Sequence, residues 1–160
     1  MAKRDENPED QDYKARSVAL RLLARREHSR HELALKLRQR KIEPALINTV
    51  LDEYEDEGWL DDHRFADVFA RQRMDAGYGP LRILADLQQR GVNFSPGCLS
   101  ETTEEQWLAS AVRLRERRFG LARLDDDLKE NLRQARFLAG RGFSRSQVER
   151  ALEARAPEDE

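Results

Sequence analysis

The stretch Asp61-Asp62-His63 has the residue types of a metal or phosphoesterase site. Gly58 is placed to end one helix, and an apolar stripe from Phe65 predicts the next, so the stretch falls at a helix N-terminus. Successive helical residues point about 100° apart, so these side chains do not readily converge on one ion. We interpret Asp61 as the helix cap, Asp62 as a first-turn carboxylate and Phe65 as a core residue. A metal-dependent hydrolase is therefore the least favoured function.

A second group of candidate ligands is His28, His31 and Glu32, which could share a helix face. The metalloprotease pattern requires a further histidine at position 35, where the chain has Leu35. We interpret the group as a helix cap with two exposed histidines.

Phosphate-binding and nucleophile patterns are also incomplete. Gly77-Tyr78-Gly79 follows an expected helix, not a strand, and lacks the third glycine of a dinucleotide fingerprint. Cys98 is the only cysteine, so neither an intrachain disulfide nor a cysteine zinc cluster can form. The sequence thus predicts no catalytic residue, no metal and no cofactor.

The elements that position these residues are predicted to be helices. A capping box pairs a Ser or Thr at the N-cap with a Glu or Gln three residues later. The chain has such boxes at Ser29 with Glu32, Thr103 with Gln106, and Ser144 with Gln147. No stretch alternates apolar and polar residues as a strand does. We therefore expect an all-α protein.

Similar segments recur along the chain, starting at residues 37, 87 and 138, and each ends a predicted helix with a short turn. Each unit has the size of a three-helix, helix-turn-helix-like module. We predict an elongated array of three tandem three-helix repeats at 13–58, 59–102 and 103–155, because units this small pack on their neighbours. A disordered tail at 1–12 and an acidic tail at 156–160 complete the expected organisation.

Charge is segregated although the net charge of the 160 residues is only −2. Residues 14–41 carry ten Lys or Arg against two Glu, whereas residues 43–62 carry eight Asp or Glu and no Lys or Arg. The basic block is either a phosphate-binding face or a solvated helix face, and a solvated face is favoured for the acidic block. The candidate residues for nucleic-acid or filament binding are Arg25, Arg26, Arg30, Arg38, Lys41, Arg71, Arg73, Arg82, Arg90, Arg117 and Arg118.

The composition favours a cytoplasmic protein. The N-terminal residues contain no apolar signal segment, and no window approaches the roughly 18 apolar residues of a membrane span. We expect no membrane association.

Several runs together resemble the RecX family, the regulatory proteins of the RecA recombinase. They are Leu-Asp-Asp-x-Arg-Phe-Ala at residues 60–66, Ser-Arg-x-Glu-Leu at 29–33, Gly-Tyr-Gly-Pro-Leu-Arg at 77–82 and the segment at 137–152. The resemblance covers residues 16–155. The chain departs from the family pattern at Trp59, where an aliphatic residue is more usual, and in the short, polar segment 95–103.

The resemblance implies a non-catalytic, monomeric regulator that binds the RecA filament on single-stranded DNA. Such proteins usually inhibit ATP hydrolysis and strand exchange, in homologous recombination, DNA repair and the SOS response. The resemblance implies no cofactor and no small-molecule substrate. The alternative is a helix-turn-helix transcriptional regulator of duplex DNA, with recognition helices at 44–57, 96–101 and 145–154. The first of these is acidic, which is the wrong sign for a major groove.

Overall fold

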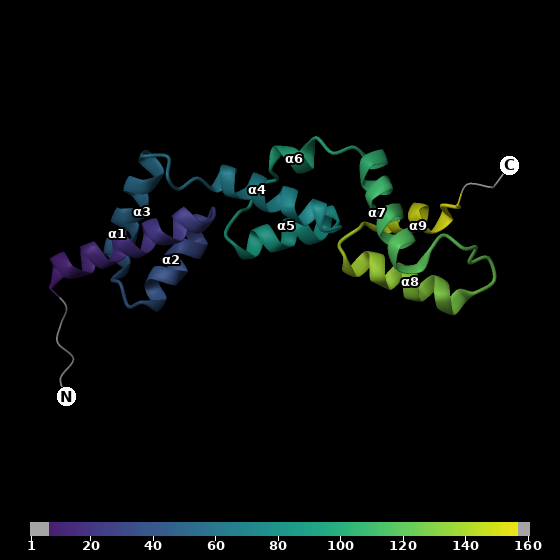
Figure 1. The fold of residues 1–160 in the computed structure, drawn as a ribbon, viewed down its shortest axis with the longest axis horizontal. Helices are drawn as coiled ribbons and strands as arrows, with labels where there is room; N and C mark the ends of the chain where they lie inside the picture. The colour runs from purple at the N-terminus through teal and green to yellow at the C-terminus, as the bar shows by residue number, and fades with distance from the viewer. Residues whose placement is uncertain (1–6, 157–160) are drawn as a thin grey trace, which may run out of the picture. The chain divides into compact units, whose positions relative to one another are not determined.

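The computed structural model describes residues 7–156, and within them every regular element is an α-helix (Figure 1). The expected all-α class is confirmed. The helices are α1 Pro8–Arg25, α2 Arg30–Gln39, α3 Pro44–Asp56, α4 Asp62–Asp75, α5 Pro80–Gln89, α6 Gly97–Ser100, α7 Glu104–Phe119, α8 Leu128–Gly140 and α9 Arg145–Glu153. Residues 97–100, from the short polar segment noted above, form the single turn of α6.

The N-terminal helix starts earlier than predicted. Residues 8–12 belong to α1, although the sequence was expected to be a disordered tail up to residue 12. The reason is local: the Asn7 side chain accepts the Glu9 N–H, and Pro8 occupies the first helical turn, where a missing N–H costs nothing. Residues 157–160 of the expected acidic tail lie outside the described residues.

The three capping boxes are present as the sequence indicates. In each, the hydroxyl accepts the backbone N–H three residues later, and the Glu or Gln side chain accepts the N–H of the cap residue. They begin α2, α7 and α9. Asp127 caps α8 by accepting the Glu130 N–H at 3.0 Å.

The chain packs as two compact units. The first runs up to Val68 and includes Gln89–Asn93, and the second comprises Phe69–Gln88 and the chain from Phe94 onward. The predicted middle repeat, 59–102, therefore contributes residues to both units. In the first unit, apolar stripes of α1, α2 and α3 form one core: Ala15, Val18, Ala19, Leu22, Leu33, Leu37, Ile47, Val50, Leu51 and Tyr54.

Asp61 and Asp62 begin α4 but serve two different helices. The Asp61 carboxylate accepts the N–H groups of His63 at 2.9 Å and Arg64 at 3.2 Å, so it caps α4. The Asp62 carboxylate accepts the N–H of Arg30 at 2.8 Å, in the first turn of α2. The interpretation of Asp62 as a partner of its own helix alone is thus incomplete. The two carboxylates are directed to separate backbone groups.

A turn with a glycine of positive φ packs against the same first turn of α2. Gly91 has φ +76°, and a Cβ built there would lie 2.6 Å from the His31 Cβ. Within the second unit, Gly142 (φ +101°) lies against the first turn of α5, where a Cβ would overlap Arg82. The Gly142 carbonyl accepts the Leu81 N–H at 3.0 Å. We call these two contacts the glycine joints.

The glycine joints explain why the corresponding turn after α2 can carry a side chain. Lys41 occupies the place that Gly91 and Gly142 occupy in the repeated segment, and it also has a positive φ, 62°. Its side chain is present and exposed, so this turn has room for one. The glycine is required where a helix start closes over the turn.

Replacing Gly91 by Ala should lower the free energy of unfolding more than replacing Gly58 by Ala. Both glycines have nearly the same φ, +76° and +77°, but a Cβ at Gly58 has nothing within 4 Å. Both variants should lose about 1–2 kcal/mol to the left-handed backbone. Gly91→Ala should lose a further 1–3 kcal/mol, roughly, because His31 must move. Urea unfolding measures the difference, and equal losses would show that the joint tolerates a methyl group.

Asp62 and Phe65 should also contribute different amounts to the free energy of unfolding. Asp62→Ala removes one cap acceptor from α2 and should cost about 1 kcal/mol. Phe65 is 3% exposed, and Phe65→Ala should cost about 3–5 kcal/mol because it leaves a cavity. Thermal unfolding of the two variants tests this order. A larger loss for Asp62→Ala would mean that the carboxylate does more than complete the helix start.

Candidate nucleic-acid interface

The acidic block neutralises part of the basic block within the first unit. Arg30 forms ion pairs with Asp52 at 2.7 Å and Glu55 at 3.0 Å, both on α3. Arg26 pairs with Glu32 at 3.1 Å. These two candidates are therefore held by carboxylates. The acidic block is not simply a solvated face, as the sequence had suggested, because its residues bind neighbouring helices.

Arg16 shows the same arrangement on α1. Its guanidinium donates to Glu53 of α3 at 2.6 Å and to Asp12 at 3.1 Å. The hydrogen bond to Glu53 raises the pKa of Arg16 above its usual value and, reciprocally, lowers the pKa of Glu53. Charge segregation along the chain is thus partly converted into pairing between helices.

Four candidates of the first unit are exposed, namely Arg25, Arg26, Arg38 and Lys41, and Arg26 is held in the ion pair with Glu32. The side chains of the other three form no ion pair with any residue that the structure describes. Arg90 belongs to this unit as well, and it is half-buried with a partner of its own. The accessible positive charge of the unit is therefore smaller than its sequence suggests.

The expectation of two exposed histidines is wrong for His28, which is 1% exposed, whereas His31 is exposed. The His28 Nδ1 lies 3.1 Å from the Arg26 carbonyl, and its Nε2 lies 2.9 Å from the Lys36 Nζ. A neutral ring with its proton on Nδ1 satisfies both contacts. Burial lowers the pKa of His28, and burial likewise lowers the pKa of Lys36.

In the second unit, arginines alternate with aromatic rings. Arg73 lies over Phe69 at 4.9 Å and over Tyr78 at 5.5 Å. Arg141 lies over Tyr78 at 4.9 Å and over Phe137 at 5.4 Å. These distances, from guanidinium carbon to ring centroid, are in the range of cation–π attraction.

The alternation continues beyond Phe137. Arg118 lies over Phe137 at 4.7 Å and over Phe119 at 5.7 Å, and Arg133 lies over Phe119 at 5.3 Å. The Phe119 and Phe137 rings meet edge to face, with centroids 5.3 Å apart. We call the whole set the arginine–aromatic ladder: Phe69, Arg73, Tyr78, Arg82, Arg141, Phe137, Arg118, Phe119 and Arg133.

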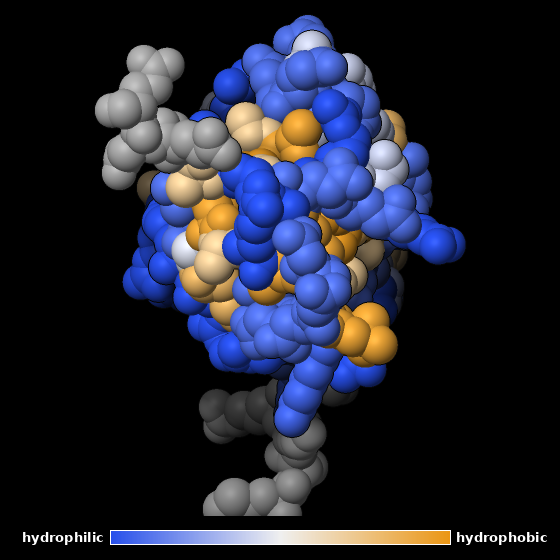
Figure 2. All heavy atoms as spheres, turned by 90° about the vertical axis from the view of Figure 1, so that its right-hand side faces the viewer, coloured by the Kyte–Doolittle hydropathy of each residue, from blue (hydrophilic) through white to orange (hydrophobic). Residues whose placement is uncertain are grey.

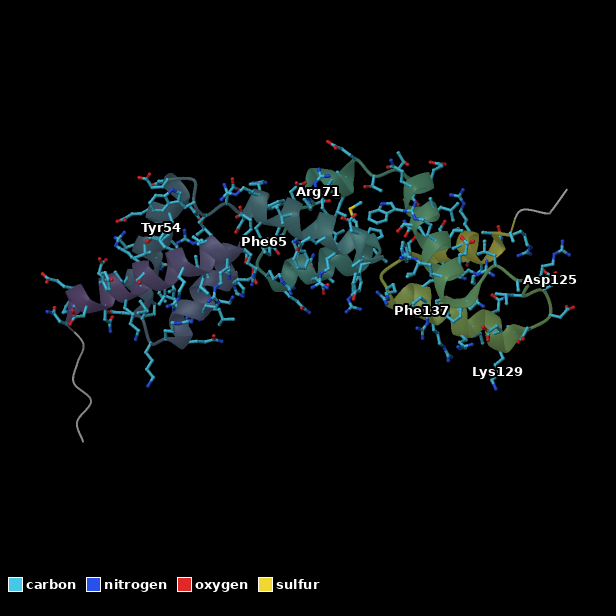
Figure 3. All side chains as sticks on the ribbon, in the orientation of Figure 1. Tyr54, Phe65, Arg71, Asp125, Lys129 and Phe137 are labelled. Atoms are coloured by element: carbon cyan, nitrogen blue, oxygen red, sulfur yellow. The ribbon has the colours of Figure 1, made fainter. Side chains whose placement is uncertain are left out.

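The ladder borders a shallow hollow of about 480 Å³, lined by Ala76, Leu114, Arg117, Arg118, Phe137 and Arg141. Phe137 lies on α8, and Arg71, a candidate outside the ladder, lies on α4 (Figure 3). Figure 2 shows a largely hydrophilic face on which apolar residues gather in separate patches. The lining of the hollow itself combines three guanidinium groups with the Phe137 ring and two aliphatic side chains.

The structure brings four of the predicted candidates together in the second unit. Arg73, Arg82 and Arg118 belong to the ladder and Arg117 lines its hollow. The aromatic members were not among the residues predicted from the sequence, because the arginines that contact them come from several different helices. One available signal was Arg141, which precedes Gly142 in the repeated turn.

One arginine of the third repeat has a structural role. Arg115 is 0% exposed, and its guanidinium donates to the Gln134 side chain and to the carbonyls of Ala122, Ala151 and Ala154. Burial lowers its pKa. It anchors the end of α9, so it does not belong with the arginines available for a partner.

Comparison with known proteins identifies the fold family. Models of three RecX domains match the chain: the first three-helix domain at residues 15–53, the second at 61–93 and the third at 104–152. The chain belongs to the RecX family. The resemblance noted in the sequence is thereby confirmed.

Among the relatives, the regulatory protein RecX of Halorhodospira halophila is 51% identical over 148 residues, which cover 91% of this chain and 89% of that protein. RecX of Pseudomonas fluorescens is 41% identical over 145 residues, covering 90% and 93%. The crystal structure of RecX from Lactobacillus salivarius matches with a TM-score of 0.77 at 22% identity, covering 90% of this chain and 96% of that one. This last likeness shows a shared fold.

The described residues contain no group of three His, Cys, Asp or Glu side chains that could hold a metal ion. Within the same residues, no helix is long and apolar enough to span a membrane.

His28 should make stability depend on pH near neutrality. Its pKa is below the ordinary value of 6.5 in the folded protein, so below pH 6.5 the unfolded chain binds more protons than the folded one. The free energy of unfolding should therefore fall as the pH drops from 7 to 5. His28→Gln should flatten this slope relative to the wild-type protein. Urea titrations at several pH values measure the slope, and identical slopes in the wild-type protein and the variant would contradict the assignment.

Proposed function

We propose that this protein is a non-catalytic regulator that binds the RecA filament on single-stranded DNA and lowers its ATPase and strand-exchange activity. The observation that carries the proposal is the match to proteins named regulatory protein RecX over about nine-tenths of the chain. The regulator would act in the cytoplasm, as a monomer, in DNA repair by homologous recombination and in the SOS response. It would need no cofactor and no small-molecule substrate.

The contacts of the most enzyme-like stretch support a regulator over a hydrolase. Asp61 and Asp62 each accept backbone N–H groups at separate helix starts. Both carboxylates therefore have roles in holding the fold.

The distribution of charge supports a filament over duplex DNA as the target. In the helix-turn-helix alternative, α3 would enter the major groove. Its Asp52 and Glu55 instead pair with Arg30, and the helix carries no Lys or Arg. A single-turn α6 is also too short for a recognition helix. Three candidates of the first unit, Arg25, Arg38 and Lys41, are exposed and lie outside any ion pair of the described residues, and they fit sequence-independent phosphate contacts.

The boundaries of the repeats are part of the same proposal. We infer that 13–58, 59–102 and 103–155 act as the three functional modules. The three family matches each fall inside one of these ranges.

Adding the purified protein to RecA and single-stranded DNA should lower the rate of ATP hydrolysis in a saturable manner. The variant Arg25→Gln/Arg38→Gln/Lys41→Gln should weaken this effect and flatten its dependence on log salt by about two units, because each lost single-strand phosphate contact removes about 0.7. A coupled ATPase assay at several salt concentrations measures both quantities.

The matched control is Lys129→Gln/Arg145→Gln/Arg150→Gln, which removes three exposed cations from α8 and α9 and gives the same net charge. Equal effects of the two triple variants would mean that only overall charge matters. An unchanged ATPase rate with saturating wild-type protein, together with no binding to the filament, would refute the proposed function.

A further inference from the structure

We propose that the arginine–aromatic ladder binds single-stranded nucleic acid directly, with a phosphate held by the guanidinium groups around Tyr78 and a base stacked in the hollow beside Phe137. The inference deepens the proposed function, on which it rests, by naming a binding site within the regulator. It also predicts binding in the absence of RecA, so the proposed binding site and the proposed function can fail separately.

Positive charge converges around the Tyr78 ring. The guanidinium groups of Arg73, Arg82 and Arg141 all lie within 5.5 Å of the centre of the Tyr78 ring. Like charges at such spacing repel, and the repulsion is relieved when an anion binds between them. Among the described residues, the only carboxylate in an ion pair with these three arginines is Asp86, 3.7 Å from the Arg82 Nε. The cluster therefore retains net positive charge.

Two members of this cluster, Arg82 and Arg141, are already fixed by hydrogen bonds. Arg82 donates to the Gly140 carbonyl at 3.0 Å, and the Arg141 carbonyl accepts the Gly79 N–H at 2.8 Å. Both contacts belong to the glycine joint of the second unit. Because the backbone on either side of the ladder is fixed, less conformational entropy is lost when a phosphate binds. Guanidinium groups suit phosphate because they can donate two hydrogen bonds at once.

The hollow also has an aromatic surface, which Phe137 supplies. Phe137 is half-buried, and Arg118 and Arg141 lie at 4.7 and 5.4 Å from its centroid. Bases stack on aromatic rings and on guanidinium planes, and only unpaired bases are free to do so. An acidic peptide would satisfy the charges but would leave this surface unused. The combination favours a single strand over both a duplex and an acidic segment.

The proposal is tested by fluorescence anisotropy with the full chain, without RecA. The probes are a fluorescein-labelled oligothymidine of 15 nucleotides, an abasic strand of the same length and a 15-base-pair duplex. Wild-type protein should bind oligothymidine about tenfold more tightly than the abasic strand, as expected for one stacked base. It should also prefer oligothymidine to the duplex.

Two variants separate stacking from charge. Phe137→Leu should remove the preference for oligothymidine over the abasic strand, so that it weakens binding of oligothymidine more than binding of the abasic strand. Arg141→Gln should weaken binding to both strands and flatten the salt dependence by about 0.7 units. Arg145→Gln is the control for charge, because Arg145 is an exposed residue outside the ladder that pairs with Glu149. Circular dichroism melting verifies that each variant folds. If Phe137→Leu does not fold, Arg141→Gln still tests the proposal.

The inference would be overturned by equal affinity of the wild-type protein for oligothymidine and the abasic strand, or by equal effects of Arg141→Gln and Arg145→Gln. It would also be overturned by displacement of oligothymidine by polyglutamate as efficiently as by unlabelled oligothymidine. The last would assign the ladder to an acidic protein segment. Absence of RecA-free binding at 50 mM salt (roughly the low-salt end for such contacts) would also overturn it. Inhibition of the RecA ATPase could persist in every case, so the proposed function would stand or fall on its own assay.

Discussion

The first turn of a helix has backbone N–H groups without partners inside the helix, and in this protein two such turns are completed by a later part of the chain. The first turn of α2 gives its Arg30 N–H to Asp62, and the first turn of α5 gives its Leu81 N–H to the carbonyl of Gly142. In both places a glycine with positive φ allows the close approach. Modules with few aromatic residues and small cores are thereby joined through backbone contacts that a single added methyl group would disturb.

The ladder depends on the second of these joints. Arg82 and Arg141 each make two contacts: a hydrogen bond that closes the joint, and a stacking contact that places the guanidinium over Tyr78. The binding surface and the packing between α5 and the turn after α8 are thus built from the same residues. This coupling gives a physical reason for arginine, whose planar group stacks on a ring while it donates hydrogen bonds at its edge.

The arginines, which looked alike in the sequence, fall into classes that only their neighbours distinguish. Arg30 is paired with α3, Arg115 is buried against carbonyl groups, Arg118 lies over aromatic rings, and Arg38 is exposed. A guanidinium carries the same charge in all four settings, so residue type and local spacing do not separate them. The distinction arises from carboxylates, carbonyls and rings that other helices contribute.

The sequence by itself determined the all-α class, the three capping boxes and the repeated turn, because a capping box, a proline at the first turn and an apolar stripe act within a few residues. It also identified Asp61 as the start of α4 and carried the family resemblance. Only the tertiary structure decided that Asp62 completes α2, that His28 is buried beside Lys36, and that Tyr78 and Phe137 gather arginines. Those outcomes depend on which helices meet after folding, and contacts between residues far apart in the chain leave no local periodicity from which they could be predicted.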